Sequence, residues 1–66
     1  MNELFYKFSD ADDFANRLFK VVNVNVYIFE IRKLADINHA KYIVSLSEDL
    51  CVPADSVTKT IKTFLK

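Results

Sequence analysis

The chain has 66 residues, which is enough for one small domain, residues 1–66, and too few for two separate hydrophobic cores. Hydrophobic residues make up 52% of it and charged residues 27%, a balance that excludes disordered and collagen-like chains. Nine basic residues match nine acidic residues, so no net charge attracts the chain to nucleic acid or anionic lipid. No apolar run is long enough to span a bilayer, and the first residues lack a signal-peptide pattern, so we expect a cytoplasmic protein with no membrane partner.

Residues that carry catalytic or metal chemistry are scarce. Cys51 is the single cysteine and His39 the single histidine, which excludes an intramolecular disulfide and a structural zinc site. The chain has no glycine, so it lacks a phosphate-binding loop of the P-loop or dinucleotide type. The sequence offers no nucleophile to partner His39, and the apolar neighbours of Cys51 are typical of an inert thiol. We therefore expect no enzymatic activity, no cofactor and no metal.

The first part of the chain predicts a strand followed by a helix. Residues 3–8 alternate in hydrophobicity as a strand does, with every second residue from Leu4 on the side expected to face the core. Ser9 is a typical helix N-cap, and the apolar residues that follow recur at helical spacing. We expect this helix to extend from Ser9 to about Val22.

Residues 24–34 are dense in β-branched and aromatic side chains, which predicts a second strand. Both faces of this strand are apolar, with Val26 and Ile28 on one and Tyr27 and Phe29 on the other. A strand of this kind is either central in a sheet or covered on its second face by something outside the chain.

The end of the chain predicts another helix. Pro53 is typical of a first helical turn, because its fixed φ suits the helix and its missing N–H is not needed there. Val57, Ile61 and Phe64 follow it at helical spacing. We therefore expect a final helix over residues 53–65.

Residues 36–51 admit two interpretations. Residues 41–47 alternate in hydrophobicity, which indicates a strand preceded by a hairpin loop at 35–39. The apolar residues of 37–51 also share one helical face, which indicates a helix. We favour the strand, because two parallel strands joined by a helix form a poorly buried sheet unless a third strand lies between them.

Together these elements predict an α+β fold of order β-α-β-β-α, in which a three-stranded sheet carries two helices on one face. The third strand lies between the first two and runs antiparallel to both. This order resembles a ferredoxin-like split β-α-β fold without its last strand. The resemblance covers nearly the whole chain and implies architecture only, because that fold hosts many unrelated functions.

The helical interpretation has a resemblance of its own. Residues 46–65 are similar to the helix-turn-helix of phage Cro-type repressors, with Leu50 and Val52 beside the turn, although Cys51 stands where that family prefers glycine. This resemblance implies a DNA-binding transcriptional regulator. The residues that would contact bases and phosphates are Ser56, Thr58, Lys59 and Lys62. Residues 41–66 hold four lysines against three acids, a charge that does not favour DNA.

The predicted sheet leaves one apolar face and one strand edge without cover. Both helices lie on one side of the sheet, and the outer edge of residues 3–8 has no partner strand. The side chains expected on this face and edge are Glu3, Phe5, Lys7, Tyr27, Phe29 and Ile43. We therefore expect a protein–protein interaction module whose partner is another protein or a second copy in a homodimer. The bias toward Asn, Lys, Ile, Phe and Tyr is common where the coding DNA is rich in A and T, which suggests a phage or mobile-element gene. Together with the open surface it favours a phage-type regulator or inhibitor of a host protein.

Overall fold

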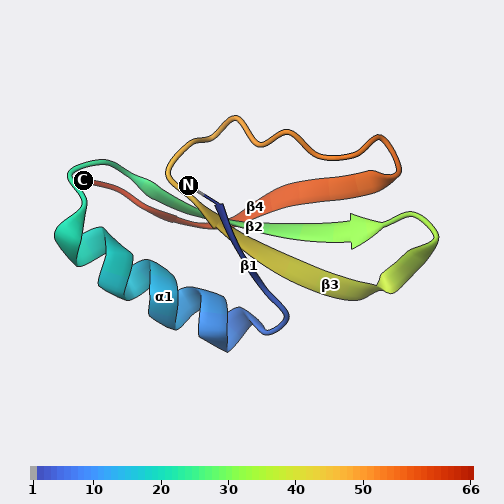
Figure 1. Cartoon of the computed structure of the whole chain (residues 1–66), viewed down its shortest axis with the longest axis horizontal. Helices are drawn as coiled ribbons and strands as arrows, with labels where there is room; N and C mark the ends of the chain where they lie inside the picture. The colour runs from blue at the N-terminus through green and yellow to red at the C-terminus, as the bar shows by residue number, and fades with distance from the viewer. Residues whose placement is uncertain (1) are drawn as a thin grey trace.

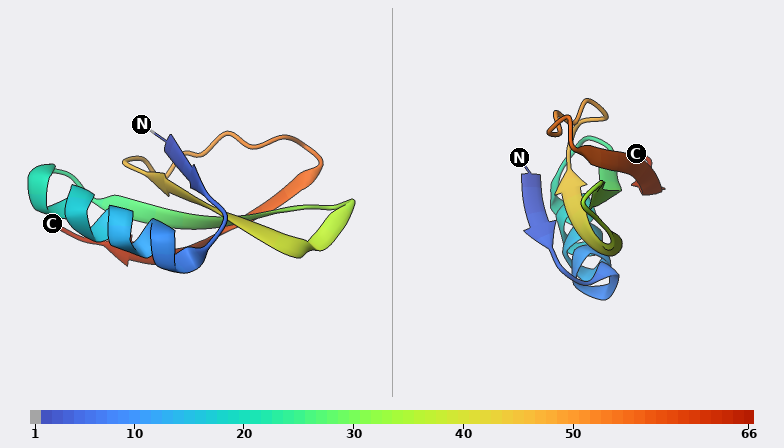
Figure 2. Two further views of the ribbon diagram at one scale, coloured as in Figure 1. Left: turned by 60° about the horizontal axis from the view of Figure 1, so that its bottom comes forward. Right: turned by 90° about the vertical axis from the view of Figure 1, so that its right-hand side faces the viewer.

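The computed structural model describes residues 2–66 and contains one helix and a four-stranded antiparallel sheet. Its elements are β1 (Asn2–Phe5), α1 (Phe8–Val21), β2 (Val26–Lys33), β3 (Asp36–Ser45) and β4 (Ser56–Phe64). The strands lie in the order β1-β3-β2-β4, and every neighbouring pair is antiparallel. The helix lies on one side of the sheet and the long β3–β4 loop on the other (Figure 1), while β1 and β4 form opposite edges (Figure 2).

The α+β class is confirmed, as is the position of the third strand between the first two and antiparallel to both. Of the two interpretations of residues 36–51, the strand is correct, although β3 begins at Asp36. The predicted hairpin loop at 35–39 is wrong, because β2 and β3 are joined by a tight turn at Leu34 and Ala35.

The predicted helix over residues 53–65 is wrong, because this segment contains β4, which pairs with β2. The sheet therefore has four strands and not three, and among residues 2–66 α1 is the only helix. Residues 46–65 contain no helix, so the helix-turn-helix interpretation lacks both of its helices. The second helix of the ferredoxin-like order is absent as well, which leaves the order β-α-β-β-β.

A β-bulge explains why β4 imitates helical spacing. Lys62 pairs with Ile28 but Thr60 pairs with Phe29, so Ile61 is an extra residue in the strand. Beyond the bulge the alternation of side chains changes phase. The apolar residues thereby brought to the helix side are Val57, Ile61 and Phe64, which are four and three positions apart as in a helix.

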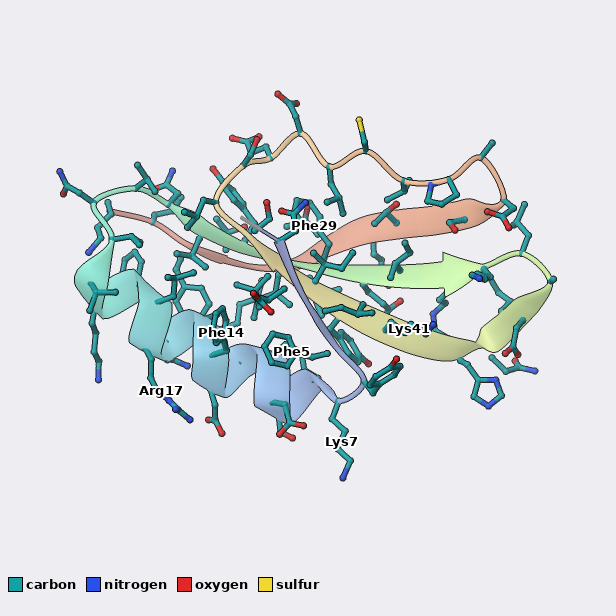
Figure 3. All side chains as sticks on the ribbon, in the orientation of Figure 1. Phe5, Lys7, Phe14, Arg17, Phe29 and Lys41 are labelled. Atoms are coloured by element: carbon teal, nitrogen blue, oxygen red, sulfur yellow. The ribbon has the colours of Figure 1, made fainter. Side chains whose placement is uncertain are left out.

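The N-terminal strand is shorter than predicted, and its faces are exchanged. β1 ends at Phe5, and α1 begins at Phe8 with Lys7 as its N-cap, so Ser9 lies inside the helix and does not cap it. Because Phe5 pairs with Tyr42, whose side chain is on the helix side of β3, Phe5 fills the space beneath α1, with its ring centroid 5.3 Å from that of Phe14 (Figure 3). Leu4 lies on the other face of the sheet and is half exposed.

The helix packs on the sheet through small residues. Ala11 and Ala15 are fully buried against the sheet residues Val26, Ile28 and Val44. Because alanine side chains are small, the helix can pack closely on the strands at Ala11 and Ala15. The rings of Phe14 and Phe19 pack around these two alanines. With 14 residues α1 is shorter than the roughly 20 that a bilayer requires, and no helix within residues 2–66 could cross a membrane.

Replacing Ile28 with alanine tests this core. Ile28 is fully buried, and such a truncation costs about 2–5 kcal/mol. A domain of this size has a free energy of unfolding of roughly 3–5 kcal/mol. We therefore expect the Ile28→Ala protein to be largely unfolded by far-ultraviolet circular dichroism and urea titration. The matched change Ile37→Ala, at a residue that is 48% exposed, should alter stability by less than about 0.5 kcal/mol.

Candidate functional site

An apolar groove with a volume of about 170 Å³ lies on the sheet face opposite α1. Its apolar lining comes from three strands and the β3–β4 loop: Leu4, Ile31, Ile43 and Pro53. Polar side chains around it are Lys33, Asp36, His39, Lys41 and Ser56. A second, more open hollow on the helix side of the sheet is lined by Phe5, Asp10, Asp13, Phe14 and Arg17.

Strand register places these residues together. Ile31 pairs with Lys41, and Lys33 pairs with both Asp36 and Ser56, so the side chains of three adjacent strands project from the same face. Ile43 pairs with Leu4 on its other side, which extends this face to the edge strand β1. Successive side chains of β2 therefore alternate between the core beneath α1 and the groove on the opposite face.

Residues 46–55, which we call the strap, cover the other part of this face. Tyr27 and Phe29 project from β2 on the side away from α1, yet they are only 8% and 5% exposed. The Tyr27 hydroxyl donates a hydrogen bond of 3.1 Å to Glu48 in the strap. At the other end, the Leu34 amide donates to the Asp55 carbonyl at 2.7 Å. The strap is thus attached at both ends, and its Pro53 forms part of the groove.

Arg32 fixes the end of the β2–β3 hairpin. Arg32 pairs with Ala40 but the next residue, Lys33, pairs with Asp36, so residues 37–39 bulge out of β3. The guanidinium of Arg32 donates to the Ile37 carbonyl at 2.8 Å and to Glu30 at 2.9 Å. The hydrogen bond from Arg32 lowers the pKa of Glu30, and Glu30 raises the pKa of Arg32 in return. This arrangement holds the bulge that carries His39 to the groove.

The polar residues around the groove do not form a catalytic relay. His39 Nδ1 lies 2.7 Å from Asp36 Oδ1, but both side chains are largely exposed. Ser56 is on β4, and β2 lies between it and the strand that carries His39, a separation of two strand spacings or about 9–10 Å. The Ser56 hydroxyl instead lies 3.5 Å from Asp55 Oδ1. Within residues 2–66, no group of three His, Cys, Asp or Glu side chains is placed to hold a metal ion.

The six residues predicted for the partner surface do not form one surface. Tyr27, Phe29 and Ile43 share the face opposite α1, but only Ile43 borders the groove, because the strap buries the two rings. Glu3 and Phe5 pair with Val44 and Tyr42, on the helix side of the sheet.

Three of the predicted positions, Glu3, Phe5 and Lys7, were therefore wrong in their face or their element. Phe5 packs against Phe14 and is not on the open face. Lys7 lies beyond β1, at the N-cap of α1, and points away from the sheet (Figure 3). The register of β1 against β3 puts Glu3 and Phe5 on the helix side, and the end of the strand at Phe5 puts Lys7 outside the sheet.

The four residues predicted for DNA contact are distributed over two faces of β4. Thr58 pairs with Ile31 and Ser56 with Lys33, on the groove side. Lys59 pairs with Glu30 on the helix side, and Lys62 binds Asp12 of α1 at 2.7 Å. They therefore lack the shared helical surface that the helix-turn-helix resemblance implies.

Sequence reasoning missed Lys33, Lys41 and Pro53 as members of one site. The signal for the lysines was the alternation itself, since Lys33 continues the series from Phe29 and Ile31, and Lys41 precedes Ile43 by two residues. No signal in the sequence placed Pro53, because its position depends on the path of the strap.

Comparison of the chain with models of protein families, with curated proteins and with solved structures finds no match.

The strap can be tested by removing one hydroxyl. Tyr27→Phe deletes the hydrogen bonds with Asn25 and Glu48, and we expect the free energy of unfolding to fall by about 1 kcal/mol. Urea titration measures this loss. The matched change Tyr6→Phe, at a largely exposed ring, should leave stability unchanged, and equal effects of the two changes would show that the hydroxyl does not hold the strap.

The ion pair of Glu30 with Arg32 predicts a pH dependence. Because the pKa of Glu30 is lowered in the folded protein, its contribution to stability is present above its ordinary value of 4.5 and is lost as pH falls through the lowered pKa. Urea titrations between pH 6 and pH 3 should show a smaller loss of stability for Glu30→Gln than for the unsubstituted protein. If the free energy of unfolding fell equally with pH in both proteins, the ion pair of Glu30 with Arg32 would not contribute to stability.

Proposed function

We propose that the chain is a small, non-enzymatic protein-binding module that regulates or inhibits a partner protein by occupying part of its surface, as a phage-type regulator would. The observation that carries this proposal is the apolar groove on the face opposite α1, which continues to the edge strand β1 through Leu4. Apolar surface of this kind in a water-exposed position is typical of a protein interface.

The edge formed by β1 favours an extended partner segment. β1 pairs with β3 only through residues 2–5, so residues 36–41 of β3 continue beyond it. The outer edge of β1 presents unpaired backbone groups to which another strand can add. The opposite edge, β4, carries lysines and a bulge, which are features that discourage strand addition.

A strand added at β1 would place alternate side chains on the two faces of the sheet. Those on the groove side would lie next to Leu4, which is 49% exposed at the groove wall. The groove and the edge therefore support one binding mode, in which main-chain hydrogen bonds supply attachment and the groove supplies selectivity.

Site-specific photo-cross-linking tests this function. A photoreactive amino acid at position 4, introduced in cells that natively express the chain, should give a discrete adduct that mass spectrometry identifies as a partner protein. Val57 is the matched control, because it is also 49% exposed but lies on the helix side of the sheet.

The cross-linking result shows whether a different protein or a second copy of the chain binds at position 4. An adduct from position 4 and none from position 57 supports the proposal. An adduct with the mass of two chains identifies a homodimer as the occupant. Equal adducts from both positions, or none from position 4, would contradict the proposed surface.

A further inference from the structure

We infer that the groove recognises an acidic segment of a partner protein that carries one large apolar side chain. The apolar side chain enters the groove, and carboxylates beside it in sequence bind Lys33 and Lys41 at the rim. This inference names the ligand of the site proposed above and rests on that proposal. It follows from the volume, the lining and the charge of the groove.

The volume of the groove matches a single large side chain. A cavity of about 150 Å³ accommodates a benzene molecule, and the groove measures about 170 Å³. This is the size of one phenylalanine, leucine or methionine side chain.

The lining of the groove favours an apolar side chain over a nucleobase. Its floor and walls are aliphatic, from Leu4, Ile31, Ile43 and Pro53. Single-stranded nucleic acid is usually held by stacking on aromatic rings. Tyr27 and Phe29 are buried beneath the strap, and the exposed ring of Tyr6, near Lys41, does not line the groove.

The unmatched charge at the rim is positive. Lys33 and Lys41 border the groove, and within residues 2–66 neither forms an ion pair. The rim also holds one acid, Asp36, which is hydrogen-bonded to His39 at 2.7 Å, so two lysines against one carboxylate leave the rim with a net positive charge. Lys41 lies with its Nζ 5.6 Å from the centroid of the Tyr6 ring, which keeps the cation near the free edge of β3. A ligand that places carboxylates on both sides of its apolar residue complements this arrangement.

Titration of the isotopically labelled protein with short peptides tests the inference. The probe is the capped pentapeptide Ser-Asp-Phe-Asp-Ser, and the amide signals of Ile31, Lys41 and Ile43 report on the groove. We expect these signals to shift at millimolar peptide and to move far less with Ser-Asp-Ala-Asp-Ser. The lysine analogue Ser-Lys-Phe-Lys-Ser should bind roughly five-fold or more weakly, since each exposed ion pair contributes a few-fold in affinity.

A second experiment reverses the charge of the two rim lysines in the protein. The double variant Lys33→Glu, Lys41→Glu should reverse the preference between the acidic and the lysine peptide. The control variant Lys7→Glu, Lys20→Glu makes the same change in net charge at two positions outside the groove and should keep the preference of the unsubstituted protein. Unfolding by urea verifies that all variants are folded.

Three results would overturn the inference: no shift of the groove amides, equal binding of the acidic and lysine peptides, or equal effects of the two double variants. If photo-cross-linking at position 4 nevertheless captures a partner, the module binds protein without an acidic, apolar anchor. If cross-linking fails as well, the proposed function is wrong together with the inference.

Discussion

The strand β2 carries buried apolar side chains on both faces, and this requires two separate covers. On one face, α1 covers Val26 and Ile28 through its small residues. On the other, the strap covers Tyr27 and Phe29, which remain nearly as buried as the residues beneath the helix. Residues 2–66 contain one helix, which covers one face, and a loop supplies the cover on the other. The strap does not cover the part of this face beyond Phe29, and the groove lies there, over Ile31 and Lys33.

Two β-bulges, at residues 37–39 and at Ile61, account for part of what the sequence did not predict. The first strand, the helix, β2 and the central position of β3 follow from alternation and spacing, and the structure has each of them. The final helix was wrong because the bulge at Ile61 spaces Val57, Ile61 and Phe64 as a helix would. The composition of this segment, rich in valine, threonine and isoleucine, favours a strand, and it proved more informative than the spacing.

The site was less predictable than the fold, because it depends on where strands and loops end. Alternation placed Ile43 on the correct face, but the pairing of β1 with β3 puts Phe5 opposite Tyr42 and therefore on the helix side. Whether an apolar face is open or closed depends on the path of the strap, which periodicity does not describe. The bulge at residues 37–39, held by Arg32, likewise has no signature in hydrophobicity, and it brings His39 to the groove.

The strap also links the stability of the domain to the shape of its groove. The same segment contains Glu48, which binds Tyr27 over the core, and Pro53, which lines the groove. Loosening the strap therefore exposes two aromatic rings and removes one groove wall at the same time. Conversely, a ligand that contacts Pro53 only when the strap is docked stabilises the docked state by mass action. For this reason substitutions beneath the strap report on stability and recognition together. Lys33 and Lys41 lie at the rim of the groove and are not part of the core. Substitutions of these two lysines therefore change ligand binding with little effect on stability.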